Sequence, residues 1–305
     1  MCHNNEGVFC APAGCSFLKM PPSCGVLRET AINDQLTKEK IAMPSTYAHY
    51  RFGRQACPLL GPDEQQTILA RPEPFLIGLH GPDIFFYHHP LSSSPIRETG
   101  YRMHDEPGEA FFAPAADILS RHTDRQAGLS YLYGFLCHFA LDSVCHPYVE
   151  EQVTRTGIAH VELEAEFDRM LMLHDGLDPL SHFPMGHIIP SMKNAAAAAP
   201  FFPDITQEQV QEVLKSMLTC SRLLLAPHLP KRLLIHAVFA LSGKSSSMRG
   251  VMIPMRPIPA CRESNRRLRE LYRKALPLAA DLIRNYRLFT EGKEELSGAL
   301  QHPFA

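Results

Sequence analysis

Apolar residues recur at three- and four-residue spacing from residue 127 onward, a pattern typical of amphipathic helices. This spacing predicts helices over residues 127–146, 158–173, 206–224, 230–242 and 262–288. Asp204 and Thr206 mark the start of one of them, and Pro147 marks the end of another. Because no alternating runs bounded by hairpin turns appear, the predicted fold is all-α, with proline-rich loops over 58–116 and 176–204.

The first 42 residues lack sustained periodicity and hold four of the nine cysteines. We expect them to form a poorly ordered tail, or to be upstream sequence that precedes an internal start at Met43, with one helical domain over 43–300. An odd number of cysteines without a CxxC pair indicates neither a disulfide framework nor a cysteine zinc site. With no signal-peptide pattern and no run of about 20 apolar residues, the expected location is cytoplasmic.

Charge is unevenly distributed although the whole chain carries a net charge of only -2, which excludes a globally basic nucleic-acid-binding protein. Residues 43–221 contain 11 basic and 22 acidic residues, whereas residues 222–289 contain 14 basic and 3 acidic ones. The basic segment fits a solvated face that complements an acidic body. It also fits a surface for phosphate-bearing ligands or anionic lipid, and so predicts peripheral membrane contact through 222–289. No protein partner is inferred.

Sixteen histidines are an unusual number for this length, and several stand at ligand spacing. The segment GFLCHFALDSVCHPYV places His138, Asp142 and His146 four residues apart, which puts them on one stripe of a helix. The next predicted helix repeats the spacing with His160 and Glu164. A lone buried histidine usually satisfies its hydrogen bonds within the core, but five such residues on neighbouring helices favour a metal site. Nitrogen and oxygen ligands without thiolate suit zinc, and manganese or iron would also fit.

Two upstream segments offer further ligands at less regular spacing, namely His80, Asp83, His88, His89, His104 and Asp105. Taken alone, such histidines are more often surface residues than ligands. Glycine and proline around Asp83 suggest a loop that brings its carboxylate to a fixed place. They become stronger candidates as ligands because two predicted helices already carry five candidate ligands, and these residues would complete the metal site.

Five motifs occur here in order: MPSTYAHY, GPDIFFY, RMH, GFLCHFALDSVCHPYV and HVELEAEFD. Together they resemble the bacterial zinc-dependent phospholipase C family, which belongs to the same all-α superfamily as the S1/P1-type nucleases. The resemblance covers about residues 43–175, and the C-terminal half matches only in being helical.

The resemblance implies a cluster of two or three zinc ions. One ion would be held by Asp83, His104, His138 and Asp142, and a second by His146, His160 and Glu164. A third would be held by His49, with Asp142 as a bridge, and is completed in secreted members by the amino group of a terminal tryptophan. This chain has no tryptophan, so the amine of Pro44 after an internal start at Met43 would serve instead. The spacing from Asp142 to His146 is also shorter than in the secreted enzymes.

The implied activity is zinc-dependent phosphodiester hydrolysis of phospholipase C type, in which a metal-activated water attacks phosphorus. Asp83 would be a ligand first and, in a second role, would orient or deprotonate that water. Loops at 84–116 and 176–204 would line the substrate site with aromatic side chains, unless these simply pack in the core: Phe85, Phe86, Tyr87, Phe111, Phe112 and Phe183.

Three alternatives remain at this point. The first is a related nuclease-type phosphodiesterase, which would need a site for stacking bases. The second is an HD-type phosphohydrolase, suggested by the doublet His104-Asp105, although Pro107 and Gly108 follow where that doublet requires a helix. The third is a non-catalytic helical protein that zinc stabilises.

Overall fold

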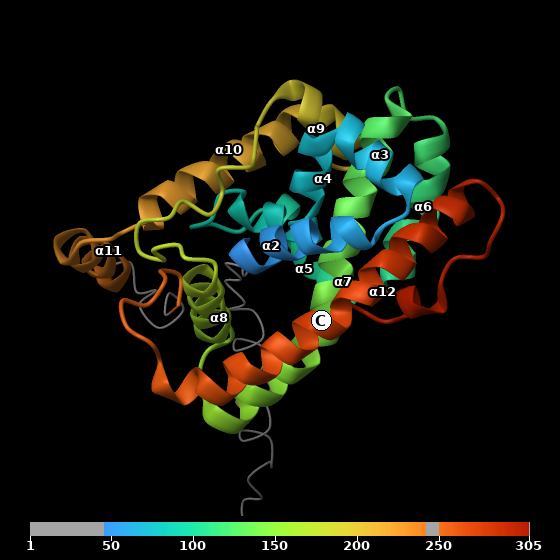
Figure 1. Cartoon of the computed structure of the whole chain (residues 1–305). Helices are drawn as coiled ribbons and strands as arrows, with labels where there is room; N and C mark the ends of the chain where they lie inside the picture. Colours follow the sequence, from blue (N-terminus) through green and yellow to red (C-terminus); the bar gives the residue numbers. More distant parts are fainter. Residues whose placement is uncertain (1–45, 242–249, 305) are drawn as a thin grey trace, which may run out of the picture. The chain divides into compact units, whose positions relative to one another are not determined.

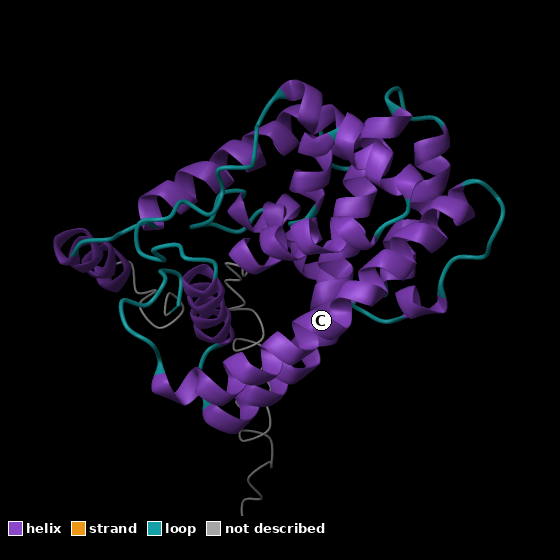
Figure 2. Ribbon diagram, viewed as in Figure 1, coloured by secondary structure: helices purple, strands orange, loops and turns teal. Residues whose placement is uncertain are grey.

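The structure is a computed structural model that describes residues 46–241 and 250–304. Within those ranges the regular elements are helices (Figure 2), apart from an isolated bridge between Pro107 and Pro303. The predicted all-α fold is therefore confirmed. The elements are α2 (Thr46–Ala56), η1 (Cys57–Leu59), α3 (Pro62–Ala70), α4 (Pro72–Gly78), η2 (Gly81–Tyr87), α5 (Pro95–Asp105), α6 (Gly108–Ser120), α7 (Arg125–Thr156), α8 (His160–His174), α9 (Met192–Ala198), η3 (Ala199–Phe201), α10 (Gln207–Leu224), α11 (Leu229–Leu241), η4 (Pro259–Cys261), α12 (Arg262–Thr290) and η5 (Gly298–Gln301).

The long helix α7 is the element against which α2, α4 and α12 pack, and α12 runs alongside it (Figure 1). Its first turn is capped by Asp124, whose side chain accepts a hydrogen bond from the backbone N–H of Ala127. It ends at Gly157, which adopts the left-handed conformation with φ of 68°. Most side chains of α7 between these ends are buried, so this helix forms the centre of the core.

The prediction that α7 ends at Pro147 was wrong, because the helix continues through this proline to Thr156. A proline inside a helix removes one backbone hydrogen bond, which normally breaks or kinks the helix. Here the residues on both sides of it are buried, with His146 before it and Val149 and Gln152 after it. Packing on neighbouring helices therefore holds the backbone helical despite the missing bond.

The prediction of long loops over 58–116 was also wrong, since α3, α4, α5 and most of α6 lie there. Pro62, Pro72 and Pro95 are each the first residue of a helix. At that position the missing N–H costs nothing and the fixed φ suits the helix, so these prolines start helices instead of excluding them. The second predicted loop, 176–204, contains only α9 and η3 as regular structure.

Helices α4 and α7 cross at two glycines that allow their backbones to touch. A Cβ atom on Gly78 would overlap the carbonyl oxygen of Tyr131, and one on Gly134 would overlap the carbonyl oxygen of Phe75. This contact fixes the end of α4 against the middle of α7. The segment that follows α4 is thereby delivered beside the part of α7 that carries the predicted ligands.

The predicted tail 1–42 and the predicted start at Met43 lie outside the described residues and stay predictions. In the part that is described, no single helix is long and apolar enough to cross a membrane, while α10 and α11, bent by 119° to each other, meet that length and composition test as a pair.

Candidate metal centre

The helical stripe on α7 forms as predicted. His138, Asp142 and His146 follow one another at four-residue intervals, and their exposed fractions are 0%, 2% and 9%. Burying two imidazoles and a carboxylate costs free energy unless each polar atom finds a partner. The side chains that could provide these partners come from four other elements, α2, η2, α5 and α8.

The structure brings all eight predicted ligands together in three groups in which the candidate ligand atoms lie within 4.8 Å of one another. The groups are His49 with His138 and Asp142, then Asp83 with His104 and His138, and finally His146 with His160 and Glu164. His138 belongs to two of them. The group of His146, His160 and Glu164 is the one predicted, whereas Asp142 is grouped with His49 and His138 and not with Asp83 and His104. Ion binding at these residues stays a prediction.

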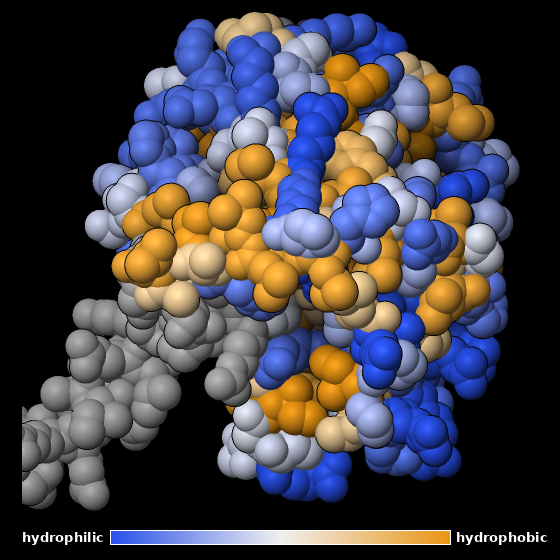
Figure 3. All heavy atoms as spheres, turned by 90° about the vertical axis from the view of Figure 1, so that its left-hand side faces the viewer, coloured by the Kyte–Doolittle hydropathy of each residue, from blue (hydrophilic) through white to orange (hydrophobic). Residues whose placement is uncertain are grey.

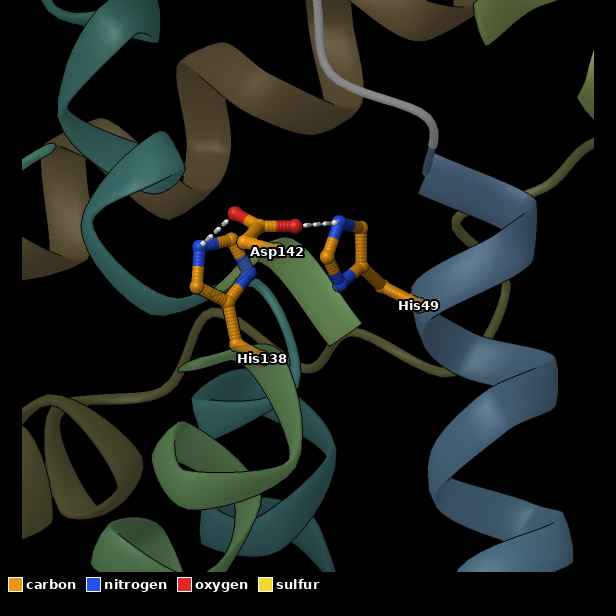
Figure 4. A group of neighbouring side chains, drawn as sticks. All are labelled: His49, His138 and Asp142. Carbon is orange, nitrogen blue, oxygen red and sulfur yellow. Dashed lines mark ion pairs between the residues drawn. The ribbon is translucent and has the colours of Figure 1, made fainter. Parts of the chain in front are cut away.

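Asp142 lies at the centre of the cluster (Figure 4). Its Oδ1 is 3.2 Å from Nε2 of His49 on α2, and its Oδ2 is 2.9 Å from Nε2 of His138. Its Oδ1 is also 3.7 Å from Nε2 of His146. A single carboxylate thus faces three imidazoles, as a bridging ligand would.

Asp83 was expected on a loop. It lies instead on the short 3₁₀ helix η2, and its side chain is buried. Its Oδ1 is 3.0 Å from Nε2 of His104, and its Oδ2 is 3.9 Å from Nδ1 of His138. Gly81 is required for this approach, because it has φ of +47° and any Cβ there would overlap the ring of His138. His104 donates from Nδ1 to the carbonyl of Gly100, at 2.7 Å, which leaves Nε2 as the nitrogen that faces Asp83.

The third group lies at the more exposed edge of the cluster. Oε1 of Glu164 is 3.1 Å from Nε2 of His160 and 3.6 Å from Nε2 of His146. The other ring nitrogen of His160 donates to Glu150, at 2.9 Å. A second carboxylate behind a histidine ligand fixes its ring orientation and increases its basicity.

The carboxylates determine the electrostatics of the cluster. Burial lowers the pKa of His49, but the neighbouring Asp142 outweighs it and raises that pKa to about 9. Burial also lowers the pKa of His160, but the neighbouring Glu164 outweighs this effect and the pKa rises to about 10. The pKa of Glu164 itself is lowered to about 2, because the charge of His160 outweighs the effect of burial. The cluster is therefore a place where positive charge is stabilised.

Several buried ring nitrogens in this cluster make no hydrogen bond, and this observation tests whether a metal fits. Nδ1 of the fully buried His138 has no hydrogen-bond partner, since the nearest carboxylate oxygen, from Asp83, is 3.9 Å away, whereas its Nε2 pairs with Asp142 at 2.9 Å. Nδ1 of His49 and Nδ1 of His146 are also unbonded. Orphaned buried polar atoms cost about 1–3 kcal/mol each, whereas a lone pair on nitrogen is what zinc requires. The residues present fit zinc.

Two further residues support the cluster and were not predicted. Glu150 is the next four-residue position after His146 on α7, and Asp168 is the next one after Glu164 on α8. Asp168 accepts hydrogen bonds from the backbone N–H groups of Tyr47 (3.0 Å) and Ala48 (2.8 Å). It caps the first turn of α2, so it positions the helix that carries His49.

Other residues singled out from the sequence lie outside the cluster. His80 is buried and bonded to His187 (2.8 Å between the Nε2 atoms), and burial lowers the pKa of both rings. His88 and His89 lie near Glu212, which forms a separate group at the surface. Asp105 is exposed although the doublet does lie on a helix, α5, so the structure gives no support to an HD-type site.

The expected aromatic walls of the substrate site belong instead to the core. Phe85, Phe86, Tyr87 and Phe112 are at most 6% exposed, and Phe111 packs on Phe135 at 4.4 Å between ring centroids. The simpler interpretation of these residues, ordinary packing, is the one that the structure supports.

A sequence profile of the zinc-dependent phospholipase C family matches residues 48–207, more than half of the chain. This chain belongs to the zinc-dependent phospholipase C family. The match extends over every one of the eight clustered ligands, from His49 to Glu164. The resemblance drawn from the five motifs is thus confirmed, and the zinc dependence of the family agrees with the donor atoms present. No curated protein and no solved structure matches the chain.

Proposed function

We propose that this member of the family is a zinc-dependent phosphodiester hydrolase that acts on phospholipids, with two or three zinc ions held by the three groups. The observation that supports it most is His138, which is fully buried between two carboxylates, with Nε2 2.9 Å from Oδ2 of Asp142 and Nδ1 3.9 Å from Oδ2 of Asp83. Its two nitrogens face different groups, so one nitrogen can bind an ion while the N–H of the other faces the carboxylate of the neighbouring group.

When bound, the zinc ions would neutralise charge that develops on the phosphoryl oxygens and lower the pKa of a coordinated water toward ~7. Residues of the chain balance the charge of the ions and orient the histidine ligands. Asp83, Asp142 and Glu164 supply negative charge that offsets the charge of the ions. Glu150 and the carbonyl of Gly100 fix the ring orientations of His160 and His104.

Substrate would approach from the edge formed by the third group. The side chains of His146, His160 and Glu164 are 11%, 26% and 10% exposed, whereas those of His138 and Asp142 are at most 3% exposed. Asp83 points both carboxylate oxygens at histidines, so we assign it first as a ligand. Orienting the attacking water is its proposed second role.

Hydrolysis of dispersed phosphatidylcholine and phosphatidylethanolamine by the zinc-loaded full chain tests the proposal. We expect release of diacylglycerol and a phosphorylated headgroup, abolished by a chelator and restored by zinc. Asp142→Asn removes the central charge and should lower turnover by at least about a hundredfold, because several kcal/mol of metal-derived stabilisation depend on it. Asp117→Asn, an exposed change on α6, is the matched control and should leave turnover unchanged.

The alternatives predict different outcomes in the same assay. Hydrolysis of single-stranded DNA without lipid turnover would assign the site to the nuclease type. Bound zinc without turnover of either substrate would leave a helical protein that zinc stabilises, and would contradict the proposal.

A cytoplasmic location remains our proposal for where this activity resides. The five cysteines in the described residues are free, which is usual in a reducing compartment. Fractionation of cells that express the full chain with a C-terminal tag would test it, and recovery from the culture medium would contradict it.

A further inference from the structure

Helix α11 exposes large apolar side chains, several of them by more than half of their surface. Of its thirteen residues only Arg232 is buried. Five of the thirteen exposed large apolar side chains in the described residues lie on it, with exposed fractions between 54% and 90%: Leu229, Leu233, Leu234, Val238 and Leu241. Figure 3 looks onto the side that carries this helix and shows apolar residues gathered in a band across that face. An exposed patch of this kind marks an interaction surface.

The first turn of α11 is nevertheless held firmly. The guanidinium group of Arg232 donates to the carbonyls of Ala226 (3.1 Å) and Ile253 (2.6 Å). The ammonium group of Lys231 donates to the carbonyls of Arg222 (3.1 Å) and Leu225 (2.7 Å). These bonds fix the direction of the helix, so its apolar side chains are presented in a defined orientation.

The charge of the sequence on either side of α11 indicates what kind of surface would cover it. The fifty residues 213–262 contain eight basic residues and no acidic one. A helix that combines exposed leucines with nearby lysine and arginine is typical of segments that lie in the interface of an anionic membrane.

The size and neighbours of α11 favour lying in the membrane plane over crossing the membrane. Thirteen helical residues extend about 20 Å, less than the roughly 30 Å of a hydrocarbon core. Helix α10, which passes the length and composition test only together with α11, buries Val210, Val213, Leu214 and Met217 in the core. Helix α10 is thus committed to the fold, and α11 alone is free to meet lipid.

The base of α11 also lies close to the metal centre. Arg232 and Leu224 line a cavity of about 80 Å³ together with Ala165 and Asp168 of α8. Ala165 directly follows Glu164 on α8, and Asp168 lies about one turn after it. A membrane bound at α11 would therefore adjoin the part of the molecule that holds the third ligand group.

We propose that α11 docks the protein on an anionic bilayer, with its leucines and Val238 in the headgroup–acyl boundary. The proposal deepens the proposed function, because the bilayer is where a phospholipid substrate resides. Membrane contact is assigned to the apolar face of α11 within the wider basic segment.

A single tryptophan can report on this contact, since the chain has none of its own. In Val238→Trp we expect the emission to shift to the blue when vesicles of phosphatidylcholine and phosphatidylserine are added to the full chain. The shift should weaken with phosphatidylcholine alone and with added salt. Leu69→Trp, at a site on α3 that is 77% exposed, is the matched control and should not shift.

Co-sedimentation with the same vesicles tests the energetics of the contact without requiring turnover. Leu233→Gln combined with Leu234→Gln should weaken binding roughly tenfold or more, because two apolar side chains no longer enter the boundary. Leu69→Gln should leave binding unchanged. A failure of lipid hydrolysis would affect only the proposed function, as these two measurements read binding.

Two results would overturn the inference. One is an unshifted Val238→Trp spectrum, or unchanged vesicle binding by the double variant. The other is a native protein that is dimeric by light scattering and becomes monomeric in the double variant, since a second copy of the chain would then be what covers α11.

Discussion

The centre of α7 and the outer face of α11 depart from the usual distribution of side chains in opposite directions. On α7, ionisable His138 and Asp142 are fully buried, whereas on α11 Leu233 and Leu234 are each 65% exposed. Neither arrangement stabilises an isolated chain: buried imidazoles lose hydrogen bonds to water, and exposed leucines gain nothing from the core. A ligand would stabilise each arrangement: zinc would bind the buried imidazoles of α7, and a lipid surface would cover the exposed leucines of α11.

The two regions also differ in how strongly the fold depends on them. The buried cluster joins α2, η2, α5, α7 and α8, so changes there should alter both the site and the fold. Helix α11 is anchored by hydrogen bonds of its first turn, and changes on its exposed face should leave the fold intact. Three variants test this contrast.

His138→Ala should have the largest effect, because this residue contributes to two ligand groups. We expect phospholipid hydrolysis to fall on the order of a thousandfold, as zinc is lost from the cluster. Initial rates at saturating zinc measure it. The control is His174→Ala, an exposed histidine at the end of α8, and equal rates for the two variants would contradict the assignment.

Gly134→Ala should destabilise the fold, because its Cβ would overlap the carbonyl of Phe75 where α4 crosses α7. Forcing the helices apart should cost about 1–3 kcal/mol of unfolding free energy. Urea denaturation measures it. Gly298→Ala is the matched control, since nothing lies within 4 Å of a Cβ there. If both variants unfold at the same urea concentration, the close crossing is not what fixes α4.

The double change Leu233→Gln and Leu234→Gln should have the smallest effect on stability, within about 0.5 kcal/mol, because both side chains already face solvent. Leu214→Ala on α10 provides the contrast, as it removes a fully buried side chain and should cost about 2–5 kcal/mol. Thermal unfolding of both variants measures the difference. A large loss of stability in the double variant would mean that α11 packs as part of the core.

Much of the cluster was predictable because helical periodicity places every fourth residue on one stripe. His138, Asp142 and His146 were found in this way, and so were His160 and Glu164. The same rule carried one step further identifies Glu150 and Asp168. Glu150 was missed because Pro147 was taken as the end of the helix.

The remaining ligands could not be placed by periodicity. His49, Asp83 and His104 come from three elements that only tertiary packing brings together, and their prediction rested on resemblance to the family. The crossing of α4 and α7 depends on contact between two glycines far apart in sequence, which no local pattern reveals. The helices over 62–120 were missed because proline was interpreted as a loop residue, although at a first helical position it favours the helix.

The metal content of the full chain, purified without chelator and measured by mass spectrometry, shows whether the three ligand groups hold zinc. We expect two or three zinc ions per chain, in keeping with the three ligand groups, and a loss of at least one of them in His138→Ala. Less than about half an ion per chain in the native protein, after zinc has been offered, would contradict the assignment of a metal centre.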